Sequence, residues 1–248
     1  MKAGWFLAAI GAAIAGLAAF FPNLAGAHQN MTHSAPPSAF WERSAEFDFD
    51  PPAPGSYRLS LIRPVPDGEV VNSDGRIGLL KDRISGRIVL LSLIYNQCSD
   101  HNGCPMATAL LYDIFEFSGL DSDIGGNLKM ISLSFDPERD TPEAMRAYGD
   151  AALNDPDAGK KAPWDFLTTR SEQSLGPILQ GFGQTRQRAL IAKNTPGKDF
   201  THLLRVFLID RDGWVRNIYG MGFLDPRLVI ADIRTLLAEE TGNPASRR

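Results

Sequence analysis

The sequence has little of what several common protein classes require. Only 2 of its 248 residues are cysteines, too few for a disulfide scaffold, and a chain of this length can bury an adequate core without one. Lys and Arg number 25 against 29 Asp and Glu, so the net charge of -4 offers no long-range attraction for nucleic acid. With 2 Cys and 4 His, a structural zinc site with four protein ligands is also disfavoured. We therefore expect no nucleic-acid partner, and the two cysteines need another explanation.

The N-terminus carries a targeting segment. An uncharged apolar run extends from Gly4 to Phe21 and is followed by small residues at 25–27. This order is typical of a secretory signal peptide that is cleaved after Ala27. The alternative is an uncleaved membrane tether through residues 4–21, because the run reaches the short end of what spans a bilayer. Both interpretations place the rest of the chain in an extracytoplasmic, oxidising compartment such as the periplasm.

The remainder of the chain divides into a short connecting segment and one domain. Residues 28–55 have no sustained apolar period and contain several prolines, which favour extended or turn conformations. We interpret them as a linker or an arm lying on the domain. Residues 56–248 show no repeat and no second core, so a single domain is expected there.

Within that domain, segments with strand character alternate with segments of helical period. Strands are predicted at 57–62, 88–95, 128–135, 164–168, 203–209 and 214–219, and helices at 105–117, from 142 onward, at 171–180 and at 226–240. The pairs Asp67-Gly68, Asp74-Gly75 and Asp212-Gly213 are typical of hairpin turns. Strands that alternate with helices indicate a layered α/β domain, here with an antiparallel hairpin near the end.

Both cysteines lie between a predicted buried strand and a predicted helix. Cys98 follows the strand at 88–95, and Cys104 directly precedes Pro105, at or next to the helix N-cap. The free N–H groups and the positive dipole end of a helix stabilise a thiolate, so we expect Cys104 to ionise readily. The loop between the cysteines contributes an imidazole from His101.

Three interpretations of this cysteine pair remain open from the residues alone. The first is a structural disulfide, which an exported protein can form. The second is a redox-active dithiol at a helix N-terminus. The third is a copper site that uses both thiolates and an imidazole, because soft thiolates and imidazole are favoured copper ligands.

Several stretches in a fixed order carry a family resemblance. They are the strand that ends at a cysteine, Cys104-Pro105, the run SFDPERDTP at 134–142, the segment 164–168, and His202 followed by RVFLIDRDG at 205–213. The part from Asp136 to Pro142 is the most specific. From about Tyr57 to Leu237 the chain resembles the Sco/SenC family of thioredoxin-fold copper proteins. The resemblance implies a thioredoxin-like domain of three layers, with a central mixed sheet and helices on both faces.

The resemblance also implies a metal site and a function. Carried over residue by residue, the two cysteines and one histidine that bind copper in the family correspond to Cys98, Cys104 and His202. Two thiolates suit Cu(I), and an imidazole lets the same site accept Cu(II). The implied protein is an exported metallochaperone that delivers copper to a centre of a respiratory oxidase, most often cytochrome c oxidase.

The chain also departs from the family pattern. Five residues separate its cysteines instead of the usual three, and Ser99 stands where the family has proline. His101 is either an added ligand or a solvated loop histidine. The alternative function is a thiol-disulfide oxidoreductase that reduces cysteines of a partner metalloprotein, with Cys98 attacking and Cys104 resolving the mixed disulfide.

The acidic residues of the specific run need an interpretation of their own. Asp136, Glu138 and Asp140 suit Asp-Pro turn chemistry and a charge that favours a helix N-terminus. The alternatives are orientation of His202 from beside the metal, or a docking contact.

Overall fold

The computed structural model describes residues 47–96, 104–192, 195–202 and 204–242, and for residues 104 and 186–202 it describes the backbone only. All of these residues belong to one compact unit, which runs from Ala35 to Arg248. The predicted signal peptide or tether and the predicted boundary after residue 27 lie outside the described residues. In the described part, no helix is long and apolar enough to cross a membrane.

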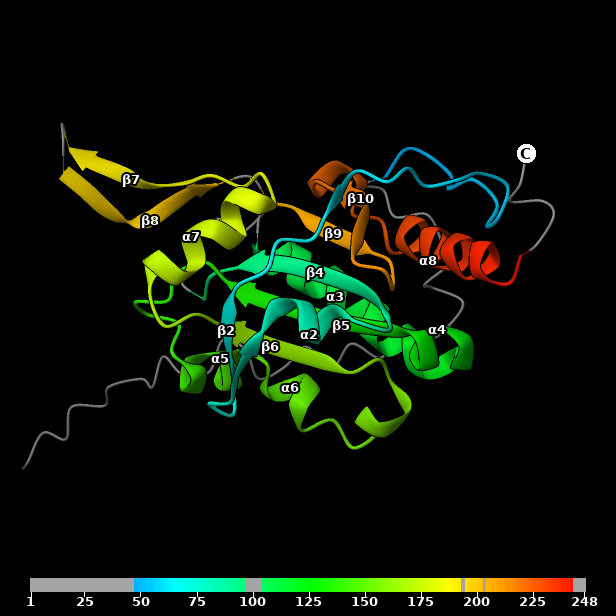
Figure 1. Ribbon diagram of the computed structural model, residues 1–248, viewed down its shortest axis with the longest axis horizontal. Coiled ribbons are helices and arrows are strands. Elements are labelled where there is room, and N and C mark those ends of the chain that lie inside the picture. Colours follow the sequence, from blue (N-terminus) through cyan, green and yellow to red (C-terminus); the bar gives the residue numbers. More distant parts are fainter. Residues whose placement is uncertain (1–46, 97–103, 193–194, 203, 243–248) are drawn as a thin grey trace, which may run out of the picture. The chain divides into compact units, whose positions relative to one another are not determined.

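Eight strands form one mixed sheet, in the order β1-β10-β9-β4-β5-β6-β2-β3 (Figure 1). Its centre consists of β4 (Ile88–Ile94), β5 (Leu128–Ser134) and β6 (Trp164–Thr168), which run parallel, and of β9 (Val206–Ile209), which is antiparallel to β4. The outer strands are β1 (Arg63–Pro64), β10 (Trp214–Tyr219), β2 (Glu69–Asn72) and β3 (Ile77–Leu79). A separate two-stranded sheet pairs β7 (Arg186–Ala192) with β8 (Thr195–His202).

Several of the helices begin after a residue whose side chain caps the first turn. They are α2 (Leu80–Ile84), α3 (Cys104–Leu120), α4 (Ser122–Asn127), α5 (Pro142–Tyr148), α6 (Asp150–Leu153), α7 (Glu172–Gly181) and α8 (Pro226–Glu240), with 3-10 turns η2 (Ala158–Lys160) and η3 (Met221–Phe223). Thr141, Ser171 and Asp225 each accept a backbone N–H from the first turn of α5, α7 and α8. Proline at the first position of α5 and α8 adds a preset backbone angle at no cost in hydrogen bonds.

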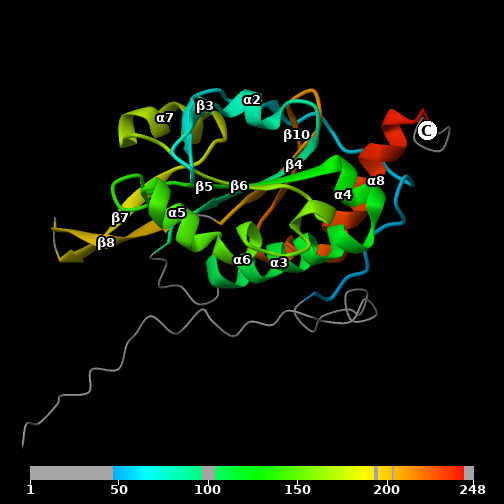
Figure 2. The same ribbon diagram turned by 90° about the horizontal axis from the view of Figure 1, so that it is seen from below.

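The sheet separates two apolar layers, because successive side chains of a strand point to opposite faces. On one face, Ile88, Leu90 and Ile94 of β4 belong to a buried cluster with residues of α3, α5, α6 and α8. On the other face, Val89, Leu91 and Leu93 cluster with residues of α2 and α7. Figure 2 shows α2 and α7 on one side of the sheet and α3, α5 and α6 on the other. The predicted three-layer α/β architecture is confirmed.

Two of the three predicted hairpin turns are present, whereas Asp67-Gly68 lies between β1 and β2, which pair with other strands. Gly75 lies between β2 and β3 with φ of 83°, and Gly213 lies between β9 and β10 with φ of 79°. Residues with a side chain rarely adopt such angles, which explains glycine at these two turns.

The predicted strand at 57–62 is wrong, since the sheet takes up only Arg63–Pro64. Side chains hold the preceding residues instead: the Tyr57 hydroxyl donates to Asp232, and Arg216 donates to the Leu59 carbonyl at 2.6 Å. These contacts hold Tyr57 against α8 and Leu59 against β10 without a continuous ladder, whereas Leu61 is exposed. The segment before them also contacts α8, because the Gly55 N–H donates to Thr235 Oγ1 at 2.9 Å.

The β7–β8 pair lies in a segment for which the sequence pattern predicted no element. The missed signal is length, since the predicted helix at 171–180 and the predicted strand at 203–209 left 22 residues between them unassigned. Structureless connections of that length are uncommon in a compact domain.

Candidate metal centre

Three segments meet at one edge of the central sheet. The register pairs Ile94 with Ser134 and Ser92 with Val206, so β4 and β5 end, and β9 begins, at this edge. We call it the carboxyl edge. Ligands of open α/β sheets bind outside the carboxyl ends of the parallel strands. A site built from the segments after β4, after β5 and before β9 is therefore geometrically available (Figure 1).

Two of the three predicted ligands lie in described elements. Cys104 is the first residue of α3, and His202 is the last residue of β8, where it pairs with Arg186. A chain of four residues reaches at most about 14 Å, which keeps the His202 backbone near Val206 at the start of β9.

The third predicted ligand, Cys98, lies outside the described residues, as do Ser99 and His101. In the sequence, Cys98 follows Asn96, the last described residue after β4, by two positions. Among the residues whose side chains are described, no three of His, Cys, Asp and Glu are grouped as a metal site. The chemistry of the predicted set fits copper, because two thiolates and an imidazole suit both of its common oxidation states.

A buried acidic turn follows β5 at the carboxyl edge. In this turn, residues 136–140, the N–H groups of Arg139 and Asp140 both donate to the Asp136 carbonyl, at 3.1 and 2.9 Å. Asp136 and Asp140 are only 1% and 2% exposed, whereas Glu138 faces solvent. The backbone of the turn therefore directs two carboxylates inward.

The acidic turn is hydrogen-bonded to the residue that leads into the cysteine loop. Asp140 Oδ2 accepts the Ser134 hydroxyl at 2.5 Å and the Asn96 N–H at 3.1 Å. Closer to the ends of the two strands, the Phe135 N–H donates to the Ile94 carbonyl at 2.9 Å. The ring centroids of Tyr95 and Phe135 lie 5.0 Å apart. The ends of β4 and β5 thus remain joined beyond the sheet.

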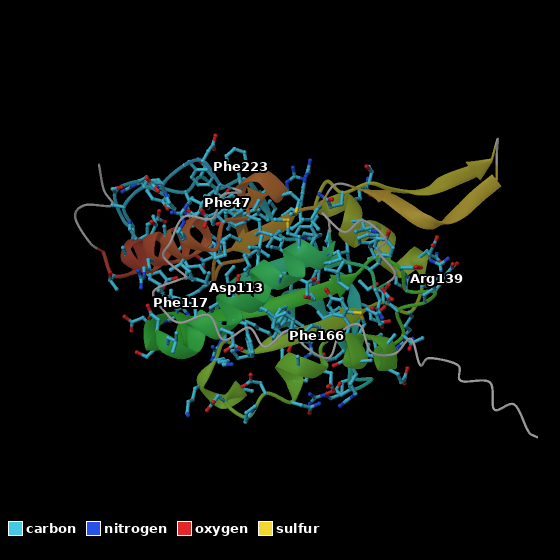
Figure 3. All side chains as sticks on the ribbon, turned by 180° about the vertical axis from the view of Figure 1, so that it is seen from behind. Phe47, Asp113, Phe117, Arg139, Phe166 and Phe223 are labelled. Atoms are coloured by element: carbon cyan, nitrogen blue, oxygen red, sulfur yellow. The ribbon has the colours of Figure 1, made fainter. Side chains whose placement is uncertain are left out.

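The electrostatics of this turn are incompletely balanced. Burial raises the pKa of Asp140, and the nearby Asp136 carboxylate adds to the rise, although the bonds from Ser134 and Asn96 act in the opposite direction. Asp136 Oδ2 accepts Arg139 Nη1 at 2.8 Å. Figure 3 labels the Arg139 side chain. Asp136 Oδ1 is buried and has no hydrogen-bond partner among the described residues.

The turn chemistry predicted for these acidic residues is present, whereas a charge effect on the N-terminus of α5 stays a prediction. Thr141, with its hydroxyl 3.3 Å from the Ala144 nitrogen, caps α5, while Asp140 serves Asn96 instead. The link to Asn96 was missed because it joins residues 44 positions apart. The available signal was two aspartates one helical turn apart directly after a buried strand, a spacing that places both on one side.

Comparison with known proteins supports the assignment of this fold and edge to a family. The SCO1/SenC family model matches residues 69–238. The SCO1 protein homolog of Bacillus subtilis (strain 168) is 26% identical over 149 residues, which cover 60% of this chain and 69% of that protein.

Solved structures agree in fold. Bradyrhizobium japonicum ScoI with copper bound matches with a TM-score of 0.51 and 18% identity, over 67% of this chain and 97% of that one. BsSco, a member of the Sco family of cytochrome c oxidase assembly proteins in which a disulfide switch is identified, matches with a TM-score of 0.53 and 23% identity, over 72% and 97%. With the family model spanning most of the thioredoxin-like domain, the chain belongs to the SCO1/SenC family.

Proposed function

We propose that this protein is an exported copper chaperone that binds one copper ion through Cys98, Cys104 and His202 and delivers it to a copper centre of a respiratory oxidase. The observation that carries the proposal is the register of β4 against β9. This pairing brings the end of β4, which precedes the cysteine segment in the sequence, and the start of β9, which follows His202, to the same carboxyl edge. Residues 1–27 serve as signal peptide or membrane tether in this proposal.

The chemistry of the donors supports both uptake and release of copper. Thiolates hold Cu(I) strongly, and the imidazole extends the site to Cu(II), so one site can retain the ion across a change of oxidation state. Cys104 begins α3, where the helix dipole and free N–H groups favour its thiolate form. The relatives give support of the same kind, since ScoI is solved with copper bound and BsSco belongs to the cytochrome c oxidase assembly proteins.

A second function is favoured by the position of Cys104 alone. A thiolate at a helix N-terminus is also the arrangement of a redox-active dithiol. In this alternative, Cys98 attacks a partner disulfide and Cys104 displaces the reduced partner from the mixed disulfide. The protein leaves oxidised by two electrons, and the partner cysteines leave reduced.

Copper titration of the reduced protein tests the proposal. We expect one copper per chain and a thiolate-to-Cu(II) charge-transfer band for the wild-type protein. The variant His202→Ala should lose this band, because the imidazole ligand is gone, while the matched variant His101→Ala should keep it. A band that survives unchanged in His202→Ala would show that the ligand assignment is wrong.

The same variants separate the two functions. Thiol-disulfide exchange needs only the cysteines, so His202→Ala should exchange at the wild-type rate, whereas Cys98→Ser should neither exchange nor bind copper tightly. Absence of copper binding in the wild-type protein, combined with rapid exchange, would favour the oxidoreductase.

A further inference from the structure

We propose that Asp140 is a positioning residue: by accepting the Asn96 N–H, it fixes the point at which the cysteine-bearing segment leaves β4. The inference rests on the proposed function for its copper readout. It concerns a residue outside the predicted ligand set, and it assigns the acidic turn to the cysteine loop rather than to α5.

The hydrogen bonds of the Asp140 side chain lead to the ends of two strands and not into its own turn. Asp140 Oδ2 accepts hydrogen bonds from the Ser134 hydroxyl and from the Asn96 N–H, and these two residues lie at the ends of neighbouring strands. The backbone of its own turn is already closed on the Asp136 carbonyl and needs nothing from this side chain. The carboxylate therefore connects the acidic turn to the last described residue before the loop.

The Asp140 carboxylate is buried and held in one orientation. Asp140 is 2% exposed, and the Ser134 hydroxyl at 2.5 Å fixes the orientation of its carboxylate. Ser134 in turn accepts the Asp136 N–H at 3.0 Å, so the hydroxyl is itself held in place. Neighbouring groups of this kind orient a binding site to within about 0.5 Å, which loop residues rarely achieve alone.

The hydrogen-bonded residue Asn96 lies close to Cys98 along the chain. Two peptide units separate Asn96 from Cys98, so a shift of the Asn96 backbone passes directly to the cysteine. A loop with five residues between its cysteines has more freedom than a shorter one, and an anchor at its start removes part of that freedom. The hydrogen bond from Asn96 to Asp140 would therefore restrict a loop that is longer than usual for the family.

The test compares Asp140→Ala with Asp140→Asn and with a matched control, Asp210→Ala. Asp210 is also a buried aspartate that accepts backbone N–H groups, from Asp212 and Trp214, but it lies where β9 ends, at the opposite edge of the sheet. Copper affinity and the rate at which iodoacetamide alkylates the reduced cysteines are measured for each variant at one pH.

We expect Asp140→Ala to weaken copper binding about tenfold, the lower end of the effect of residues that orient metal ligands, and to change the alkylation rate. Asp140→Asn keeps an acceptor oxygen for Asn96 and should retain most of the affinity, and Asp210→Ala should bind copper as the wild type does. The variant Ser134→Ala leaves the Asp140 carboxylate in place but removes the hydroxyl that donates to it, so its copper affinity should lie between those of Asp140→Ala and the wild type. It replaces Asp140→Ala in the test if that variant does not fold.

Each outcome decides between the inference and the proposed function. Equal affinity and equal alkylation in wild type, Asp140→Ala and Ser134→Ala overturn the positioning role and leave the copper function standing. An equal loss in Asp140→Ala and Asp210→Ala overturns it too, since the effect would then be general destabilisation. If the wild-type protein binds no copper, the proposed function fails, and the alkylation rates alone confirm or refute the positioning role.

Discussion

The two edges of the central sheet differ in the partners of their aspartates. Near the edge where β4 and β5 begin, which we call the amino edge, the buried Asp210 pairs with Arg216 at 3.0 Å, and the partly buried Asp121 pairs with Arg234 at 2.7 Å. At the carboxyl edge, Asp136 also pairs with an arginine, Arg139 at 2.8 Å, but the buried Asp140 has no ion pair among the described residues and accepts only a hydroxyl and one N–H.

The pKa shifts follow this difference. For Asp121, burial favours the neutral form, but hydrogen bonds from Arg234 and from the Ile124 N–H outweigh it and lower the pKa. For Asp140, burial dominates and raises the pKa. The amino edge is thus arranged for stability, whereas the carboxyl edge keeps a less compensated acid beside the segment that carries the cysteines.

The largest expected effect concerns the amino edge and the variant Arg216→Ala. The Arg216 guanidinium donates to Asp210, to Glu239 at 2.7 Å and to the Leu59 carbonyl at 2.6 Å, and its side chain is 12% exposed. Removing it leaves two acids without their cation, so unfolding free energy should fall by about 3 kcal/mol. Urea denaturation measures this, and copper binding should not change. A loss of copper-binding free energy as large as the loss of unfolding free energy would show that the two edges are not functionally distinct.

A smaller effect is expected for Asp121→Ala, which removes the N-cap of α4. The Asp121 carboxylate accepts the N–H groups of Asp123 and Ile124 at 3.0 and 3.1 Å. Loss of such a cap costs about 1 kcal/mol at neutral pH. Because the folded pKa lies below the ordinary 3.8, the charge-dependent part of this difference is present above pH 3.8 and vanishes as the pH falls through the folded value.

The matched variant Asp121→Asn keeps a capping oxygen without the charge. It should be less destabilised than Asp121→Ala at neutral pH, and thermal unfolding over a pH series compares the two. A gap from wild type that widens on acidification would contradict the lowered pKa.

The smallest expected effect is on the pH dependence of stability at Asp140, which should be opposite to that at Asp121. Its folded pKa lies above 3.8, so its contribution is complete below that pH and is lost as the pH rises through the folded value. Asp140→Asn does not titrate and should gain stability relative to wild type over this rise. The same pH series detects it, and a gain on acidification instead would mean that the carboxylate is stabilised in its charged form.

Local patterns were sufficient for most elements, but not for all. The helix at 226–240 was predicted with its observed bounds, because an aspartate cap, a proline at the first position and an apolar period agree there. The strand at 57–62 was predicted wrongly, because alternation also arises where a segment packs on a helix, as Tyr57 does on Asp232. Periodicity reports burial and cannot name the partner.

The sequence by itself determined the layered class, two of the three predicted hairpin turns and the family resemblance, and it predicts Cys98, Cys104 and His202 as metal ligands. These depend on residue type and near neighbours, which a linear sequence contains. Only the tertiary structure decided that the acidic turn accepts a hydrogen bond from Asn96, and that the pKa of Asp140 is raised while that of Asp121 is lowered. The physical reason is that burial and hydrogen-bond partners come from segments far apart in the chain, and the free energy of a charge depends on both.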